Sequence, residues 1–172
     1  RLNDDGTAPS DNPFFAEGAE RGGEVGATLQ KIFSYGHRNS FGLAVDPVTG
    51  DIWNQENGDD SFSEINHVTA GMNGGWVQIA GPVSRVAQFK EIEVSRAPGT
   101  LQQLRWLPSR LANSPDEALS RLVMLPGARY SDPEFSWKFA VAPAAIGFID
   151  GRGLGSQYRG DLIVGAARPT LL

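Results

Sequence analysis

Short apolar runs, separated by turn residues, predict an all-β fold for this chain of 172 residues. Its 21 glycines and 11 prolines are spread along the chain rather than gathered in one linker, which is typical of many turns between short strands. Hydrophobic residues make up 40% and charged residues 20%, the composition of a folded globular domain. The length suits a single domain with a core of its own.

Charge and cysteine content exclude several kinds of partner and site. The net charge of −5 argues against a nucleic-acid partner held through phosphate contacts. The chain has no run of about 18 apolar residues, so we expect no membrane span. It has no cysteine, hence neither a disulfide nor a thiolate metal site. Because it begins at Arg1 without Met and ends at Leu172 just after an apolar run, we expect it to be part of a longer protein.

The N-terminal segment is expected to be a loop up to Gly26. Pro9 and Pro13 oppose strand pairing. The acids around Asp5 lack the spacing of an EF-hand, which favours a solvated surface loop. Ala27–Tyr35 is the first candidate strand.

Four short strands follow in close succession. Gly42–Val45 and Asp51–Gln55 form a hairpin around the turn DPVTGD. Glu64–Val68 and Gly75–Ile79 are the next two. This density of strands is typical of a β-propeller blade or of part of a sandwich, and no internal repeat selects one of them.

Residues 81–127 differ from the rest and predict a helical insertion between strands. Thr100–Gln103 is a candidate capping box for a short leucine-faced helix that Pro108 ends. A stronger one is Ser114-Pro115-Asp116-Glu117, in which Ser caps, Pro suits the first helical position and Glu bonds back. That helix would end before Pro126–Gly127 and have as its apolar face Leu119, Leu122 and Val123.

The last part of the chain returns to strands. Phe135–Ala142 and Ala145–Ile149 are candidates, and Gly151–Gly160 is a loop. Asp161–Ala167 is apolar and is expected to be a buried strand.

Two groups of polar residues lie between the predicted strands. Arg binds planar carboxylates in a bidentate way and Asn adds a donor and an acceptor, so Arg38 and Asn39 would suit a polyacidic or quinone-like ligand. The alternative is an Arg paired with a surface acid. The loop Asn57–Asp60, followed by Glu64, offers oxygen atoms of the kind that calcium prefers. The alternative there is an Asx turn that joins two strands.

Several motifs in a matching order connect these groups. GHRN is followed by GLAVDPVTGDIW, then by ENG, EIN and GMNGGW. Together they closely resemble the pyrroloquinoline quinone (PQQ)-dependent sugar dehydrogenases of the soluble glucose, aldose-sugar and sorbosone type. RLNDDGTAPSDNPFF, SDPEFSW and GDLIVGAAR are similar to other segments of that family. The resemblance implies a six-bladed β-propeller, of which residues 1–172 would form a single, partial domain.

The resemblance also implies roles for individual residues. Arg38 and Asn39 match the residues that hold the PQQ carboxylates and quinone edge, and Asn57 matches a polar residue beside the cofactor. Gly58 and Asp59 match the pair whose backbone carbonyls hold the calcium ion that polarises PQQ. The family usually has Gly-Pro there, so Asp59 is a departure from its pattern.

Other positions match the family more loosely. Glu64 and the turn Asn73–Gly74 fall where some members bind a second, structural calcium. Trp137 falls where an aromatic residue faces the sugar, and Arg168 where a cofactor-contacting Lys stands.

No catalytic residue is expected in this chain. The family's base is a His in an earlier blade, and neither His37 nor His67 occupies its position. Arg38 is expected to point into the central cavity of the propeller rather than into solvent, because the neighbouring strand Gly42–Val45 is apolar and therefore expected to be buried.

The function implied by the resemblance is oxidation of an aldose sugar at its anomeric hydroxyl to the lactone, with PQQ and calcium as cofactors. An external electron acceptor would reoxidise the cofactor, and the protein would be periplasmic or secreted. Two alternatives stay open: a non-catalytic propeller fragment that serves as a scaffold or binding surface, and a calcium-dependent lactonase on a similar propeller.

Overall fold

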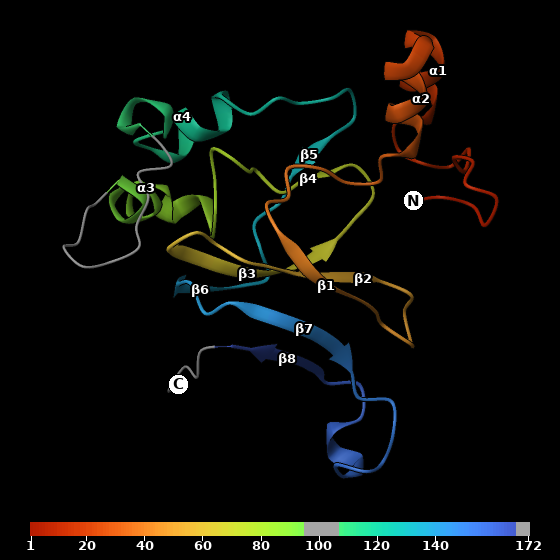
Figure 1. Cartoon of the computed structure of the whole chain (residues 1–172), viewed down its shortest axis with the longest axis vertical. Coiled ribbons are helices and arrows are strands. Elements are labelled where there is room, and N and C mark those ends of the chain that lie inside the picture. The colour runs from red at the N-terminus through yellow and green to blue at the C-terminus, as the bar shows by residue number, and fades with distance from the viewer. Residues whose placement is uncertain (95–106, 168–172) are drawn as a thin grey trace.

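A four-stranded antiparallel sheet forms the centre of the computed structural model, which describes residues 1–94 and 107–167 (Figure 1). Its strands, in the order β1-β2-β3-β6, are β1 Ser40–Val45, β2 Ile52–Glu56, β3 Ser61–Val68 and β6 Phe135–Phe139. The strands predicted in these parts of the chain are confirmed, although β3 begins at Ser61 instead of Glu64.

Pairing of β2 with β3 places polar residues opposite one another. Asn54 lies opposite Asn66, and Glu56 lies opposite Glu64. Because side chains alternate between the two faces of a strand, these four lie on the same face. All four are buried, so this face of the sheet holds an internal polar layer.

A second sheet consists of β7, Pro143–Phe148, and β8, Leu162–Ala166, and β7 lies against β1 (Figure 1). The prediction that the last strand is buried is wrong, because no residue of β8 is buried. The same prediction for β1 is wrong as well: Leu43 and Val45 are 65% and 54% exposed. No layer of the described residues covers these faces.

The prediction of a strand at Gly75–Ile79 is also wrong. Trp76–Gln78 form a turn, and Ile79 is buried in the core. The strand at this point is the two-residue β4, Met72–Asn73, which pairs in parallel with β5, Arg129–Tyr130.

Two short helices occupy the N-terminal segment, α1 at Phe15–Arg21 and α2 at Gly23–Lys31. They touch through glycines, since a Cβ added to Gly26 would lie 2.2 Å from the carbonyl oxygen of Gly18. The glycines that indicated a loop in the sequence instead let two helix backbones approach closely. The predicted loop at this position and the predicted strand Ala27–Tyr35 are therefore wrong.

Helices also occur in the segment predicted to be an insertion. They are the 3-10 turns Val83–Arg85 and Pro108–Arg110 and the α-helices α3, Val86–Val94, and α4, Pro115–Ser120. The predicted apolar face of the second helix is only partly correct, since Leu119 and Val123 are 40% and 77% exposed.

The capping signal before α4 is confirmed. The Ser114 hydroxyl oxygen accepts a hydrogen bond from the Glu117 N–H at 3.2 Å. The Glu117 carboxylate bonds back to the N–H of Asn113 at 2.7 Å rather than to Ser114, and the helix ends at Ser120, earlier than predicted. The other candidate capping box, Thr100–Gln103, lies outside the described residues.

The main hydrophobic core lies between these helices and the start of β3. It consists of Phe62, Ile79, Ala80, Val86, Phe89, Leu111, Ala112 and Ala118. Burial of each large side chain of this kind contributes roughly 1.5–3 kcal/mol. The insertion is therefore packed onto the sheet beside the loop that precedes β3.

The described chain is built mainly on sheets, with helices at its N-terminus and in the insertion. This agrees with the all-β prediction for the central and C-terminal parts and departs from it at α1 and α2. None of the helices in residues 1–94 and 107–167 has the length and apolar character that crossing a membrane requires.

Candidate functional site

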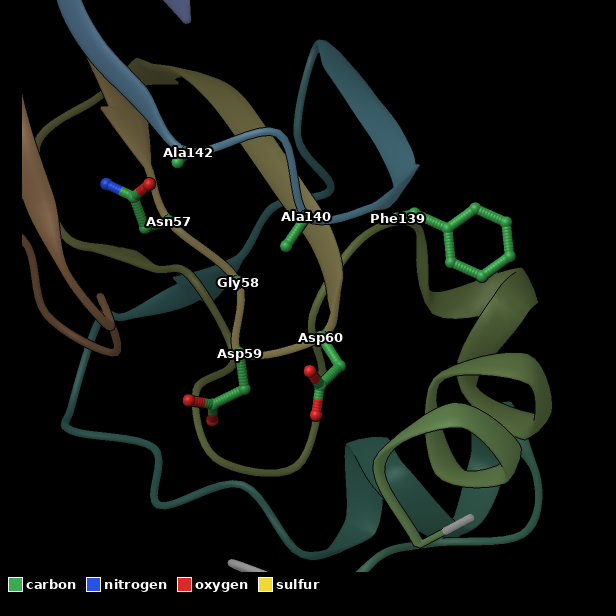
Figure 2. A pocket seen from close by; sticks show the side chains of 7 residues that line it. All are labelled: Asn57, Gly58, Asp59, Asp60, Phe139, Ala140 and Ala142. Atoms are coloured by element: carbon green, nitrogen blue, oxygen red, sulfur yellow. The ribbon is translucent and has the colours of Figure 1, made fainter. Parts of the chain in front are cut away.

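A pocket of about 200 Å³ lies at the loop Asn57–Asp60, which joins β2 to β3. The loop lines one side, and the end of β6 with the segment after it lines the other through Phe139, Ala140 and Ala142. Figure 2 shows that the Asp59 and Asp60 carboxylates extend to the same side of the loop, whereas the Asn57 amide extends away from them. The carboxylates therefore give one side of this loop its acidic character.

The Arg38 side chain binds this loop. Its Nη1 donates a hydrogen bond to the carbonyl oxygen of Asn57, and its Nη2 donates to the carboxylate of Asp59. The guanidinium also lies over the Trp76 ring, 5.4 Å from the ring centroid. The side chain is 16% exposed and that of Asp59 is 3% exposed. Arg38 is thus mostly buried, and its acidic partner is buried as well instead of lying at the surface. That Arg38 points into the cavity of a propeller stays a prediction.

One nitrogen of the Arg38 guanidinium makes no hydrogen bond. Its Nε is buried and has no hydrogen-bond partner, which is uncommon for a buried charged group. Arg38 does not itself line the pocket, whereas Asp59 does. The guanidinium therefore contacts the pocket wall through two lining residues, Asn57 and Asp59.

Glu56 fixes the chain on either side of this arginine. Its Oε1 lies 2.6 Å from Nδ1 of His37, and its Oε2 accepts the backbone N–H of Arg38 at 2.5 Å. The amides of Asn54 and Asn66 donate to Oε1 at 3.3 and 3.1 Å. The polar layer of β2 and β3 thereby positions the backbone of Arg38. Sequence reasoning missed Glu56, although its position at the end of β2, facing GHRN, was a usable signal.

Glu93 holds the other end of the loop from α3. Its Oε1 accepts hydrogen bonds from the N–H groups of Asp60 and Ser61 at 3.2 and 3.1 Å and from the Ser61 hydroxyl at 2.7 Å. Burial raises the pKa of Glu93, the bonds from Ser61 and Asp60 oppose the rise, and the charges of Asp59 and Asp60 add to it. Sequence reasoning missed Glu93 because nothing local marks which acid of this helix faces the loop.

The backbone around the pocket is tightly constrained. A Cβ added to Gly58 would lie 1.6 Å from the carbonyl oxygen of Ser61, so only glycine fits there. Phe62 and Ala142 are the non-glycine residues with positive φ in the described part of the chain, at 49° and 50°. This conformation costs about 1–3 kcal/mol per residue and is concentrated at functional sites. Ala142 lines the pocket, and Phe62 lies two positions after the loop that forms one of its walls.

The structure brings only part of the predicted site together. Asn57 is buried, its N–H donates to the Asn39 carbonyl at 3.0 Å, and its amide donates to the Pro143 carbonyl at 3.0 Å. Asn39 itself is exposed. Arg168 lies outside the described residues.

Two further predicted residues do not line the pocket. Glu64 is buried in the polar layer, where its Oε2 accepts the Gly81 N–H at 3.1 Å. Burial, and then the neighbouring Glu56 charge, raise the pKa of Glu64 well above its ordinary value. Trp137 lies on β6 and packs edge-on against Phe135, with ring centroids 4.9 Å apart.

Oxygen atoms are the potential metal donors at the pocket. No group of three or more His, Asp or Glu side chains converges on a metal position within the described ranges. Gly58 and Asp59 are among the residues that line the pocket. Backbone carbonyls of this kind are ordinary calcium ligands.

Comparison with known proteins gives consistent matches. The family model for glucose/sorbosone dehydrogenase matches residues 1–114. The chain is 40% identical over 76 residues to the aldose sugar dehydrogenase YliI of Escherichia coli (strain K12), which covers 44% of this chain and 18% of that protein. It is 40% identical over 81 residues to quinoprotein glucose dehydrogenase B of Acinetobacter calcoaceticus, which covers 47% of this chain and 15% of that protein.

A solved structure matches over a longer range. The soluble aldose sugar dehydrogenase from Escherichia coli in its apo form superimposes with a TM-score of 0.57 at 25% identity, covering 96% of this chain and 37% of that chain. The two sequence matches span only 15–18% of the length of YliI and of quinoprotein glucose dehydrogenase B. Residues 1–114 include Arg38, Glu56, the Asn57–Asp60 loop and Glu93, so the candidate site lies within the part matched by the family model. On this evidence the chain belongs to the glucose/sorbosone dehydrogenase family.

Proposed function

We propose that this chain is the cofactor-holding part of a dehydrogenase that oxidises an aldose at its anomeric hydroxyl to the lactone, with PQQ and calcium. The observation that carries the proposal is the Arg38 guanidinium, buried beside an oxygen-lined pocket with its Nε donor unused. A planar cation with a free donor is suited to a ligand carboxylate. Family membership supports the same chemistry.

The residues at the pocket fit such a cofactor. Arg38 would bind a carboxylate of PQQ, with Asn57 and Asn39 beside it. Gly58 and Asp59 would present their carbonyl oxygens to calcium, and the close packing at Gly58 leaves no room for a larger residue. When bound, PQQ supplies the hydride acceptor and calcium supplies Lewis acidity.

The outer positions of the site are proposals of the same kind. Arg168 would contact the cofactor, Trp137 would face the sugar, and Glu64 would contribute to a second calcium site. The pocket of about 200 Å³ is smaller than the roughly 300–1,000 Å³ of small-molecule sites. Further walls, and the base that removes the hydroxyl proton, would come from other parts of the intact protein.

The intact protein would be a six-bladed β-propeller that acts in the periplasm or outside the cell and passes electrons to an external acceptor. The exposed faces of β1 and β8 support this arrangement, because a propeller packs one sheet on the next and thereby covers such faces.

The test is a titration of the intact apo-protein with PQQ, with and without calcium, followed by cofactor absorbance and by dye reduction with a set of aldoses. We expect PQQ binding that requires calcium, and dye reduction with at least one aldose. Arg152→Ala, an exposed arginine, serves as a control and is expected to change neither. A protein that binds calcium but not PQQ, and reduces no dye, would favour a lactonase or a binding fragment.

A further inference from the structure

We propose that Asp59 is an internal competitor for Arg38: its carboxylate occupies the place of a ligand carboxylate and so sets the affinity of the site for anionic ligands. The inference rests on the proposed function, in which an anionic cofactor enters this pocket. It concerns the side chain of Asp59, whereas the proposed calcium contact concerns its backbone carbonyl.

Asp59 lies in the wall of the pocket, and its carboxylate accepts a hydrogen bond from Nη2 of Arg38. A ligand carboxylate that is to bind this nitrogen therefore has to displace the Asp59 carboxylate. The two side chains are 3% and 16% exposed. A cation buried to this extent needs a partner, because an unpaired buried charge is strongly unfavourable. Asp59 supplies that partner when no ligand is present.

The geometry of the Arg38 fork favours a ligand carboxylate over that of Asp59. Nε and Nη2 lie on the same edge of a guanidinium and together bind one carboxylate in a bidentate way. Asp59 accepts from Nη2, while Nε on the same edge is buried without a partner. Nη1 is already used by the Asn57 carbonyl. A ligand carboxylate that displaces Asp59 can take both donors of this edge, and Arg38 then gains a hydrogen bond that Asp59 does not provide.

Two effects of opposite sign follow. Removing the Asp59 charge lowers the stability of the apo-protein, because Arg38 loses its counter-ion. The same change strengthens binding of an anionic ligand, because the ligand no longer has to displace a carboxylate. An ion pair with a purely structural role would lower both quantities together.

The experiment compares Asp59→Asn with Asp116→Asn in the intact apo-protein. Asp116→Asn is the control because it removes the same charge from an exposed residue that does not line the pocket. We expect Asp59→Asn to lower the Tm without PQQ and to tighten PQQ binding in calcium by about tenfold, the scale of one hydrogen bond to a charged group. Asp116→Asn should change the PQQ affinity by less than about twofold, as for an exposed charge without contact to Arg38.

A second variant, Asp59→Ser, should give the same pair of changes. PQQ binding that is unchanged or weaker in both Asp59 variants, an equal effect of Asp116→Asn, or a protein that does not fold without the Asp59 carboxylate would overturn the inference and leave Asp59 as a structural counter-ion. Absence of PQQ binding in the unsubstituted protein and in every variant would instead contradict the proposed function itself.

Discussion

The Glu93 carboxylate accepts the hydroxyl of Ser61 at 2.7 Å, and this contact joins the helical insertion to the candidate cofactor loop. The same oxygen atom also accepts the N–H groups of Asp60 and Ser61. The loop is therefore held at its end by Glu93 and near its start by Arg38. Its shape depends on a helix that lies far from it in the sequence.

Replacing Glu93 with Ala is expected to lower the free energy of unfolding by about 1–3 kcal/mol, because it leaves buried donors of Asp60 and Ser61 without an acceptor. Glu93→Gln keeps an acceptor oxygen and should cost less. Glu91, which is exposed on the same helix, is the control, and Glu91→Ala should be nearly neutral. Urea unfolding of the three variants measures the difference; equal effects of Glu91→Ala and Glu93→Ala would contradict the prediction.

A methyl group at Gly58 is expected to displace the loop. The added Cβ would lie 1.6 Å from the Ser61 carbonyl oxygen, and overpacking of this kind costs typically about 1–3 kcal/mol. Gly147→Ala is the matched control, since its Cβ would meet nothing within 4 Å. Calorimetry of calcium binding by the intact protein should show weaker binding in Gly58→Ala and no change in Gly147→Ala. Normal calcium binding in both would separate Gly58 from the metal site.

The cross-strand pair Glu56 and Glu64 is expected to respond to amide substitution with opposite signs. Glu56 accepts four hydrogen bonds or close polar contacts from His37, Arg38, Asn54 and Asn66. Glu56→Gln turns one of its acceptors into a donor, so it should destabilise the fold by about 1–3 kcal/mol. Glu64→Gln keeps an acceptor oxygen for the Gly81 N–H and removes an ionisation that burial and the Glu56 charge oppose, so it should stabilise the fold above about pH 4.5.

The pH dependence of this pair follows from the raised pKa of Glu64. The folded chain retains the Glu64 proton at pH values where the unfolded chain, near the ordinary value of 4.5, has lost it. Stability should therefore fall as the pH rises from about 4.5 towards the raised pKa, and Glu64→Gln should remove that part of the slope. Thermal unfolding in a calcium chelator measures it, and an unchanged slope in Glu64→Gln would show that Glu64 is not its source.

Much of the sheet could be predicted from the sequence. The hairpin around DPVTGD and the strands near Glu64–Val68 and Phe135–Phe139 follow from short apolar runs and turn residues, which act locally. The helices α1 and α2 could not be predicted in this way. Gly18 and Gly26 are contact points between two helices. A local sequence pattern does not show that two glycines eight positions apart will be in contact.

The candidate site shows the same limit. The motif resemblance pointed to Arg38 and Asn57–Asp60, which the structure places together. It gave no sign that Asp59 would occupy the Arg38 fork, or that Glu93 would hold the loop. Both contacts depend on side-chain directions and on packing between segments distant in sequence, which local patterns do not contain.

The most direct test of the account is the affinity of the intact apo-protein for PQQ, in calcium, after substitution of Arg38. Arg38→Lys keeps the charge but loses the fork, and it should weaken PQQ binding by about 1–3 kcal/mol, the scale of a hydrogen bond to a charged group. Arg38→Ala should weaken it at least as much, and Arg152→Ala should leave it unchanged. Equal PQQ affinity in all three variants and in the unsubstituted protein would contradict the central claim that Arg38 binds the cofactor.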